Sequence, residues 1–191
     1  MNDFLSKGGI ILYPTDTLYG LGVDALNVEA LKKLKQLKGR DEGKPISIIV
    51  CDMEMAGVYA EITPLAKKLA EKFLPGKLTL VLKANDKLPE ELTSGTGTVG
   101  IRIPKHHLCI HIVREFGKPI TATSANVADM EAKNSVEEIL DQFQERSVMI
   151  DRVIDTGKLP DSLPSTVVDA RGEKPIVLRE GAIKAEDIEN I

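Results

Sequence analysis

The sequence is short of several residue types, and each shortage narrows what the chain can be. Its 191 residues include no tryptophan, two cysteines and 4% aromatic residues, while 42% are hydrophobic. Because aromatic residues are scarce, the core must be built from leucine, isoleucine, valine and alanine. Two cysteines give neither a disulfide framework nor a metal-binding spacing, so we expect Cys51 and Cys109 to be reduced thiols.

Long apolar runs are missing as well. The apolar stretch near the start, residues 9–13, is too short to cross a membrane or to serve as a signal peptide. We find no targeting segment, repeat or low-complexity tract, so we expect a cytoplasmic protein without membrane contact. The formal net charge of −4 counts against a large nonspecific nucleic-acid surface, because such a surface usually makes a domain basic.

Strand-like and helix-like segments are mixed along the chain. Apolar runs predict strands at residues 9–13, 46–50, 78–82, 99–103, 119–123, 153–155, 166–169 and 176–178. Helix-start signals occur at Asn27, Thr63-Pro64 and Ser135-x-x-Glu138, and residues 107–115 are also helix-like. Since the order shows no regular strand–helix–strand repeat, we expect an α/β (α+β-like) fold, with one domain over residues 1–191 and a twisted mixed sheet flanked by helices.

Two short polar motifs are candidates for ligand binding. Lys38-Gly39-Arg40 follows the first predicted helix, and Ser124-Ala125-Asn126 follows a predicted strand. The guanidinium of Arg40 can hold a carboxylate or phosphate through two hydrogen bonds, and Lys38 and Lys44 add point charges. However, the helix dipole also favours cations at a helix C-terminus, and Ser and Asn in loops often bond their own backbone. Taken singly, both motifs leave binding and plain loop structure open.

For other polar residues, too, the sequence leaves ligand binding and a purely structural role open. Thr15, Asp16 and Thr17 follow a buried strand, in the kind of loop where α/β proteins often place ligands, although a polar turn is the alternative. Strand alternation puts Arg102 on the face opposite its apolar neighbours. That face is either solvent or a cleft in which the guanidinium needs an anionic partner, and the same holds for Arg179.

Several well-known site patterns are absent. The sequence contains no P-loop and no Rossmann fingerprint, and its spacing specifies no Ser-His-Asp or Cys-His arrangement. His106, His107 and His111 stand near Cys109, but a zincin glutamate and a second cysteine are lacking, so we expect no metal site there. A nucleotide would have to be held by another device.

Seven blocks occur in a fixed order along nearly the whole chain. They are YPTDTLYGLG (13–22), KGR (38–40), LPGKLTLVL (74–82), VGIRIP (99–104), TSAN (123–126), PSTVVDA (164–170) and VLREGAI (177–183). Together they closely resemble the YrdC/TsaC family of L-threonylcarbamoyladenylate synthases, whose hallmark is Lys-x-Arg combined with Ser-x-Asn. The resemblance implies a single YrdC-like catalytic domain.

The resemblance also implies a reaction. L-Threonine and bicarbonate give N-carboxy-threonine, its carboxylate attacks the α-phosphorus of ATP, and diphosphate leaves. The product, L-threonylcarbamoyl-AMP, passes to a downstream threonylcarbamoyl-transfer complex that modifies tRNA. On this basis the chain is expected to be a nucleotidyltransferase with ATP as a substrate and Mg²⁺ on the phosphates.

Residue roles are implied in the same way. Threonine and the carbamate would be held by Thr17, Arg40, Arg102 and Ser165. The nucleotide would be held by Thr15, Lys38, Lys44, Ser124, Asn126 and Arg179. Lys38 and Arg40 are the expected catalytic residues, and no protein ligand to a metal is expected.

The chain departs from the family pattern at two places. Some members carry a His in the strand corresponding to residues 46–50, near the position of Ile48, and many continue after Ser-x-Asn with Ser-Gly, where this chain has Val127-Ala128-Asp129. Two alternatives therefore stay open: a YciO-type paralogue, or a module on the same scaffold that binds RNA weakly through the basic strip of residues 32–44.

Overall fold

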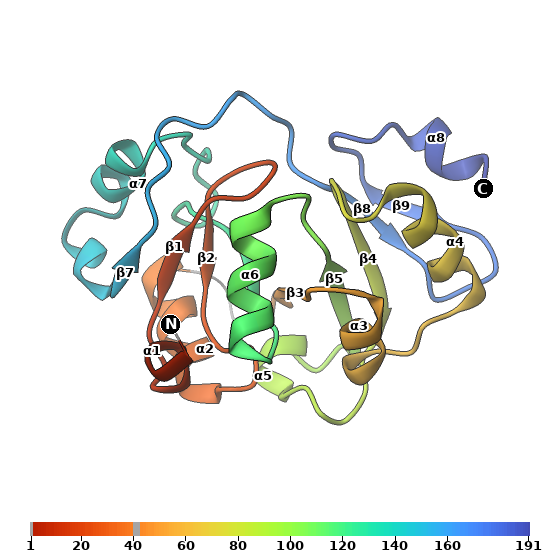
Figure 1. The fold of residues 1–191 in the computed structure, drawn as a ribbon, viewed down its shortest axis with the longest axis horizontal. Coiled ribbons are helices and arrows are strands. Elements are labelled where there is room, and N and C mark those ends of the chain that lie inside the picture. Colours follow the sequence, from red (N-terminus) through yellow and green to blue (C-terminus); the bar gives the residue numbers. More distant parts are fainter. Residues whose placement is uncertain (1, 40–42) are drawn as a thin grey trace.

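One mixed β-sheet organises the molecule (Figure 1). The computed structural model describes residues 2–39 and 43–191, and within them nine strands pair in the order β7-β1-β2-β6-β3-β5-β4-β8-β9. The strands are β1 (Ile11–Tyr13), β2 (Gly20–Gly22), β3 (Ser47–Ile49), β4 (Leu78–Lys83), β5 (Thr98–Arg102), β6 (Ile120–Ser124), β7 (Arg152–Val153), β8 (Thr166–Asp169) and β9 (Ile176–Arg179). The pairs β1–β7, β3–β5 and β4–β8 are parallel, and the others are antiparallel. The predicted mixed-sheet α/β fold is thus confirmed.

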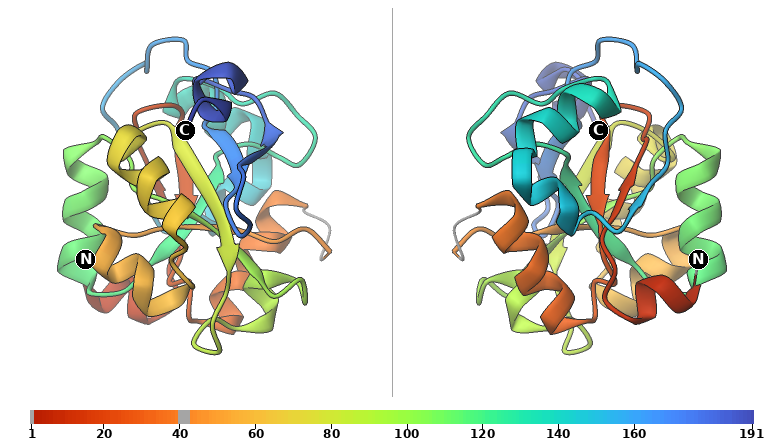
Figure 2. Two further views of the ribbon diagram at one scale, coloured as in Figure 1. Left: turned by 90° about the vertical axis from the view of Figure 1, so that its right-hand side faces the viewer. Right: turned by 90° about the vertical axis from the view of Figure 1, so that its left-hand side faces the viewer.

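Helices lie on both sides of the strands, as Figure 2 shows. They are α1 (Asn2–Ser6), α2 (Val28–Lys38), α3 (Met53–Tyr59), α4 (Pro64–Phe73), α5 (Glu90–Thr93), α6 (His107–Phe116), α7 (Val136–Phe143) and α8 (Ala185–Glu189), with a 3₁₀ turn at Gln144–Met149. In the part of the chain that the structure describes, no helix is both long and apolar enough to cross a lipid bilayer.

Each face of the sheet has its own apolar cluster, because neighbouring strand residues point to opposite faces. Leu12 and Ile48 belong to the larger cluster, which also contains Leu34 of α2. Ile11 and Ile49 belong to the smaller cluster, which contains side chains of α1 and α6. All five side chains are fully buried, so the core has two layers, with the sheet between them.

Three helices begin where the sequence predicts. The side chain of Asn27 caps α2, and that of Thr63 caps α4 with Pro64 in the first turn. Ser135 caps α7. These starts could be predicted because a cap is a contact between residues three apart, and its partners are present in the local sequence.

Strand β2 is the element that the sequence pattern misses. Gly20–Gly22 reads as a turn, yet all three residues are buried between β1 and β6. The ring of Tyr13 fills the space beside this strand, and a Cβ at Gly22 would lie 2.8 Å from Tyr13 Cε1. Long-range packing therefore requires glycine in a strand, against its local preference. Strand β7 also differs slightly, since it covers Arg152–Val153 where residues 153–155 were predicted.

The cap of α4 gives a first prediction. Thr63→Ala should lower the free energy of unfolding by about 1 kcal/mol, because Thr63 Oγ1 accepts from Ala66 N–H (3.0 Å) and donates to the carbonyl of Ala170 (2.7 Å). Equilibrium urea unfolding measures the loss as a lower midpoint at an unchanged slope. Thr63→Ser keeps the hydroxyl and should retain most of the stability. Equal midpoints for the Ala variant and the wild type would show that the cap contributes nothing.

Candidate functional site

A cavity of about 850 Å³ opens on the face of the sheet that carries α6. Four segments build its walls: the β1–β2 loop, the chain around β3, the end of β6 with the loop after it, and residues 161–165 before β8. These segments are far apart in the sequence. The site is therefore a product of the tertiary fold.

Most of the predicted site residues reach this cavity. Those that line it are Thr15, Thr17, Arg102, Ser124, Asn126, Ser165 and Arg179. Lys38 and Lys44 lie next to its walls, on either side of the part of the loop that is not described. Arg40, which was predicted to be catalytic, lies outside the described residues.

The β1–β2 loop is shaped by a threonine hydroxyl. Thr15 Oγ1 accepts from the N–H groups of Thr17 (3.1 Å) and Leu18 (3.2 Å) and donates to the carbonyl of Leu18 (2.7 Å). These short-range bonds close a tight turn after β1. The result is that the Thr17 hydroxyl, 3.0 Å from that of Thr15, is presented toward the interior of the site.

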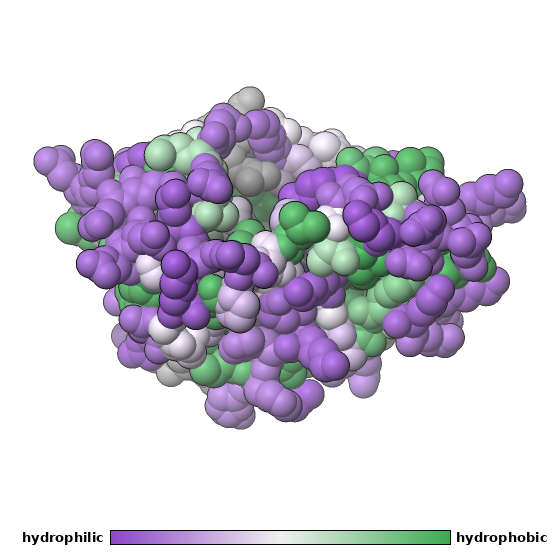
Figure 3. All heavy atoms as spheres, turned by 90° about the horizontal axis from the view of Figure 1, so that it is seen from above, coloured by the Kyte–Doolittle hydropathy of each residue, from purple (hydrophilic) through white to green (hydrophobic). Residues whose placement is uncertain are grey.

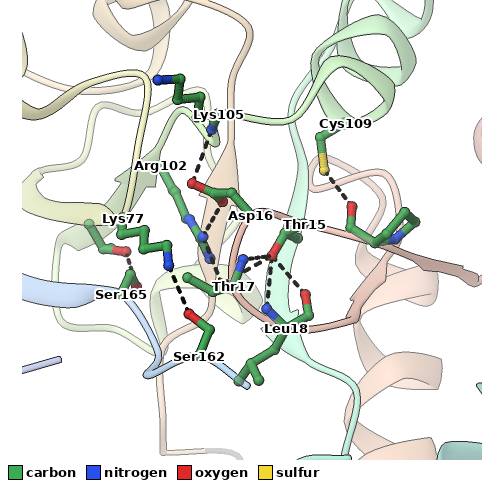
Figure 4. Close-up of polar contacts among 12 residues, drawn as sticks. Thr15, Asp16, Thr17, Leu18, Lys77, Arg102, Lys105, Cys109, Ser162 and Ser165 are labelled. Carbon is green, nitrogen blue, oxygen red and sulfur yellow. Dashed lines mark hydrogen bonds and ion pairs between the residues drawn. The ribbon is translucent and has the colours of Figure 1, made fainter. Parts of the chain in front are cut away.

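A buried ion pair joins this loop to β5 (Figure 4). Arg102 Nη2 lies 2.6 Å from Asp16 Oδ1 and donates to Thr17 Oγ1 at 2.8 Å, while Asp16 Oδ2 accepts from the backbone N–H of Lys105 at 3.1 Å. The side chains of the pair are only 11% and 10% exposed. Arg102 Nε is buried and has no hydrogen-bond partner among the described residues. A buried donor of this kind is costly unless a ligand satisfies it.

A second arginine, Arg179 at the end of β9, lines the same cavity. Arg179 Nη2 donates to the carbonyl of Ser165 (2.8 Å), and the hydroxyls of Ser165 and Thr79 lie 2.8 Å apart. Burial, and then the nearby charge of Arg102, hold the pKa of Arg179 below its usual value. The cavity therefore brings together two cations that repel each other, which is an arrangement suited to an anionic ligand.

Lys38 binds the backbone of the Ser-Ala-Asn loop. Its residue is 2% exposed, and its ammonium donates to the carbonyls of Ser124 and Asn126, the second at 2.7 Å. The backbone adds a further link, because Ala128 N–H donates to the carbonyl of Lys38 (2.8 Å). The structure thus connects the two motifs that the sequence analysis singled out. The role predicted for Lys38 on the phosphates stays a prediction.

Within that loop, the polar side chains also bond locally. Ser124 Oγ donates to Asn126 Oδ1, and Asn126 Nδ2 donates to the carbonyls of Val127 (2.8 Å) and Met130 (2.7 Å). These bonds agree with the plain loop reading of the motif, and ligand binding by Ser124 and Asn126 stays a prediction. Ser124 and Asn126 stabilise their own loop, and the loop lies in the cavity wall.

Lys44 has a weaker tie. Its ammonium lies 3.8 Å from Asp129 Oδ1, and both side chains are largely exposed. Asp129 adopts a left-handed backbone conformation (φ 62°). The Val-Ala-Asp departure from the family pattern thus places a carboxylate beside the cation that was predicted to bind ATP.

Sequence reasoning missed part of the site. Asp16 was placed in a candidate ligand loop with a polar turn as the alternative, and its role as the counter-ion of Arg102 was missed. The cavity floor was missed altogether: Ser47 on β3 and Thr79 on β4 face the site across Gly100 of β5. A Cβ at Gly100 would lie 2.2 Å from Ser47 Oγ, so only glycine fits between these side chains. Strand alternation could have suggested Thr79, but not the contact that excludes a side chain at Gly100.

The thiol and imidazole groups near α6 do not form a site of their own. Cys109 is fully buried, its thiol donates to the carbonyl of Pro14 (3.1 Å), and burial raises its pKa well above the usual range. His107 and His111 lie exposed on α6. Neither imidazole is among the side chains that line the cavity.

Comparison with protein families gives one clear match. A family model named Sua5/yciO/yrdC and described as telomere recombination matches residues 3–181. Among curated proteins, the threonylcarbamoyl-AMP synthase of Pyrococcus abyssi is 34% identical over 189 residues, which cover 98% of this chain and 55% of that protein. The threonylcarbamoyl-AMP synthase of Bacillus subtilis is 34% identical over 98% of this chain and 54% of its own length. The chain thus spans about half the length of these two relatives.

Solved structures agree with the fold. Pyrococcus abyssi Sua5 complexed with L-threonine superposes with a TM-score of 0.92 at 34% identity, covering 99% of this chain and 55% of that one. Escherichia coli YciO superposes with a TM-score of 0.86 at 26% identity, covering 97% of this chain and 89% of that one.

The Arg102–Asp16 pair gives a second prediction. Asp16→Ala leaves a buried arginine without its counter-ion and should cost roughly 3 kcal/mol of unfolding free energy. Equilibrium urea unfolding measures it. Asp3→Ala removes another Asp–cation contact, but Lys7 and Asp3 are both exposed, so its urea midpoint should match the wild type. Equal losses of unfolding free energy in the two variants would contradict a buried ion pair between Asp16 and Arg102.

Proposed function

Because the chain belongs to the Sua5/yciO/yrdC family, we propose that it is an enzyme, an L-threonylcarbamoyladenylate synthase. Its similarity to proteins of that name and to a threonine complex of Pyrococcus abyssi Sua5 supports the proposal. The proposed reaction is a nucleotidyl transfer that uses L-threonine, bicarbonate and ATP. We further propose that residues 1–191 act as one catalytic domain in the cytoplasm, without a membrane.

The observation that carries the proposal is the burial and fixed orientation of the Arg102 side chain. This guanidinium is buried, is fixed by Asp16 and Thr17, and has an Nε without a partner among the described residues. An arginine held rigidly in this way can bind a carboxylate with little loss of side-chain freedom. Both threonine and its N-carboxy derivative present carboxylates, so the substrates match the unsatisfied donor.

The chemistry has two steps. The amine of threonine takes up the carbon of bicarbonate and water leaves, which gives N-carboxy-threonine. An oxygen of its new carboxylate then attacks the α-phosphorus of ATP, the bond to the β-phosphate oxygen breaks, and diphosphate leaves with its electron pair. The product is L-threonylcarbamoyl-AMP. In this second step the protein supplies alignment and charge neutralisation, and no protein nucleophile is required.

The threonine end of the site is assigned to the side of the cavity around Arg102. Arg102 would hold a carboxylate, and the Thr17 hydroxyl beside it would bind the hydroxyl that distinguishes threonine from alanine-like substrates. Ser165, 5% exposed and bonded to Thr79, would complete this end. Arg40 is assigned here by family resemblance, since it lies outside the described residues.

The nucleotide end is assigned to the loop after β6. Ser124 and Asn126 would contact the nucleotide, with Lys44 and Arg179 near its phosphates and Thr15 shaping the adjacent loop. For Lys38 we propose that its ammonium fixes the Ser-Ala-Asn loop and adds positive charge beneath it. This role agrees with the bonds from the ammonium to Ser124 and Asn126.

Magnesium would enter on the triphosphate. Across the described ranges, no group of three or more His, Cys, Asp or Glu side chains could hold a metal ion. Carboxylates at the cavity have protein partners: Asp16 is paired with Arg102, and Asp161 accepts from Asn134 at 2.6 Å. These residues do not fit a protein cage for Mg²⁺, which is commonly held by substrate phosphates and water.

The product would serve a downstream threonylcarbamoyl-transfer complex that modifies tRNA. A YciO-type paralogue is the second candidate for the function, and the similarity to Escherichia coli YciO supports it.

An RNA-binding module is the third candidate, because exposed lysines such as Lys32 lie on α2.

The central test is diphosphate release from ATP in the presence of Mg²⁺, L-threonine and bicarbonate. The wild type should release diphosphate only when both threonine and bicarbonate are present. Lys38→Ala should lower the rate at least tenfold, or about 1.4 kcal/mol in barrier, because the Ser-Ala-Asn loop loses its anchor. Lys32→Ala, on the exposed face of the same helix, should turn over at the wild-type rate. A folded wild type without threonine-dependent release would refute the synthase.

A binding experiment separates the RNA-binding module. Titration of tRNA into the protein without ATP should show no saturable binding at micromolar concentration, since the net charge is −4 and counter-ion release dominates nonspecific affinity. Micromolar, salt-dependent binding that is lost in Lys32→Ala, together with absent diphosphate release, would favour that module instead.

A further inference from the structure

A long segment crosses the site, and we call residues 154–165 the strap. It leaves β7 at one edge of the sheet and enters β8, which pairs with β4 and β9 near the other edge. Figure 1 shows it arching over the top of the molecule. Its last part, residues 161–165, lines the cavity. The strap therefore forms a wall of the site although it has no regular secondary structure.

The surface seen from above is mostly hydrophilic on its flanks, with hydrophobic residues mixed in between (Figure 3). On the strap itself, Leu163 is 59% exposed. Few strap side chains are buried in the core. Its position must therefore depend on a small number of polar anchors.

The first anchor is the hydroxyl of Tyr19. This residue is 1% exposed, and its hydroxyl donates to the carbonyl of Gly157 (2.7 Å) and accepts from the N–H of Thr156 (3.0 Å). Gly157 adopts a left-handed conformation (φ 84°), and its N–H donates to Asp155 Oδ1 (2.8 Å). Tyr19 thus fixes the tight turn with which the strap begins.

Tyr19 is also tied to two other walls of the cavity. It directly follows Thr17 and Leu18 of the β1–β2 loop, and its carbonyl accepts from the N–H of Ala125 (2.8 Å) in the Ser-Ala-Asn loop. One buried residue of the β1–β2 loop therefore bonds to two further segments, the start of the strap and the Ser-Ala-Asn loop. A substrate that orders one of these segments can affect the strap through it.

The far end of the strap has anchors of its own. Asn134 accepts from Leu159 N–H at 2.8 Å through its carbonyl and donates to Asp161 at 2.6 Å through its side chain. Lys77, just before β4, donates to Ser162 Oγ at 2.9 Å (Figure 4). These anchors hold residues 159–162, which lead from the Tyr19 turn into residues 161–165, the part of the strap that lines the cavity.

We propose that Tyr19 is a positioning residue for the reaction, and that its hydroxyl holds the strap over the threonine end of the site. This inference rests on the proposed function. N-carboxy-threonine is a carbamate, and a carbamate released into water loses its carboxyl group again. A wall that keeps it in place until it attacks the α-phosphorus raises the yield of product, because proximity replaces a second encounter.

The position of the strap predicts which substrates are affected. Ser165 lies at the end of the strap and contacts Thr79 at the threonine end, whereas the Ser-Ala-Asn loop is held by Lys38 and by the backbone carbonyl of Tyr19, neither of which involves the Tyr19 hydroxyl. Loosening the strap should therefore raise the KM for threonine and for bicarbonate and leave the KM for ATP nearly unchanged. A general loss of stability would not divide the substrates in this way.

The test is Tyr19→Phe, which removes only the hydroxyl. Backbone amides of residues 155–163 should exchange with deuterium at least tenfold faster, while amides of β3 and β5 exchange as in the wild type. In the diphosphate assay, the KM for threonine should rise at least fivefold and that for ATP less than twofold. Lys77→Met releases the strap at its other end and should change the exchange and the KM values in the same direction.

Two controls isolate the effect. Thr63→Ala loses comparable stability in α4 without touching the strap, and Tyr59→Phe makes the same chemical change elsewhere in the core. Both should keep the wild-type KM for threonine. Unchanged strap exchange in Tyr19→Phe, or faster exchange with equal KM values for threonine, would overturn the positioning role alone. Absence of threonine-dependent turnover in the wild type would overturn the proposed function and this inference with it.

Discussion

The buried pair of Arg102 and Asp16 is the interaction on which the site depends. It joins β5 to the loop between β1 and β2, and it gives the buried guanidinium an anionic partner. A buried pair of this kind often contributes little to net stability, because desolvation of both groups offsets their attraction. Its effect here is geometric. Asp16 and Thr17 occupy Nη2, so the remaining donors of Arg102 keep one direction.

A second buried cation organises the opposite wall. Lys38 ends helix α2, and its ammonium satisfies the carbonyls of the Ser-Ala-Asn loop. The carbonyl of Ser124 also accepts from Asn126 N–H (3.0 Å), and such bonds matter because unsatisfied buried backbone groups are costly. The lysine therefore allows β6 to end in an irregular loop directly at the cavity. Loop shape and positive charge at this wall thus come from one side chain.

Local sequence predicted the parts of the structure that depend on local contacts. Helix caps at Asn27 and Thr63 could be read because both partners lie within one turn. Ordered motifs pointed to most cavity residues. Strand β2 could not be read, since its glycines are required by the ring of Tyr13. The pairing of Asp16 with Arg102 joins residues 86 positions apart, and no local pattern encodes such a contact.

The residues that line the cavity also suit the second step of the proposed reaction, in which a carboxylate attacks the α-phosphorus of ATP. When a carboxylate displaces diphosphate from the α-phosphorus, neither reacting oxygen gains or loses a proton, so a general acid or base contributes little. Positive charge near the phosphate oxygens and a fixed orientation of the reacting groups contribute most to the acceleration of this step. Among the described lining residues, Arg102 and Arg179 supply charge, while Thr17, Ser124 and Ser165 supply directional hydrogen bonds. Burial and the nearby charge of Arg102 lower the pKa of Arg179, so an anionic ligand that contacts both guanidinium groups would offset their repulsion.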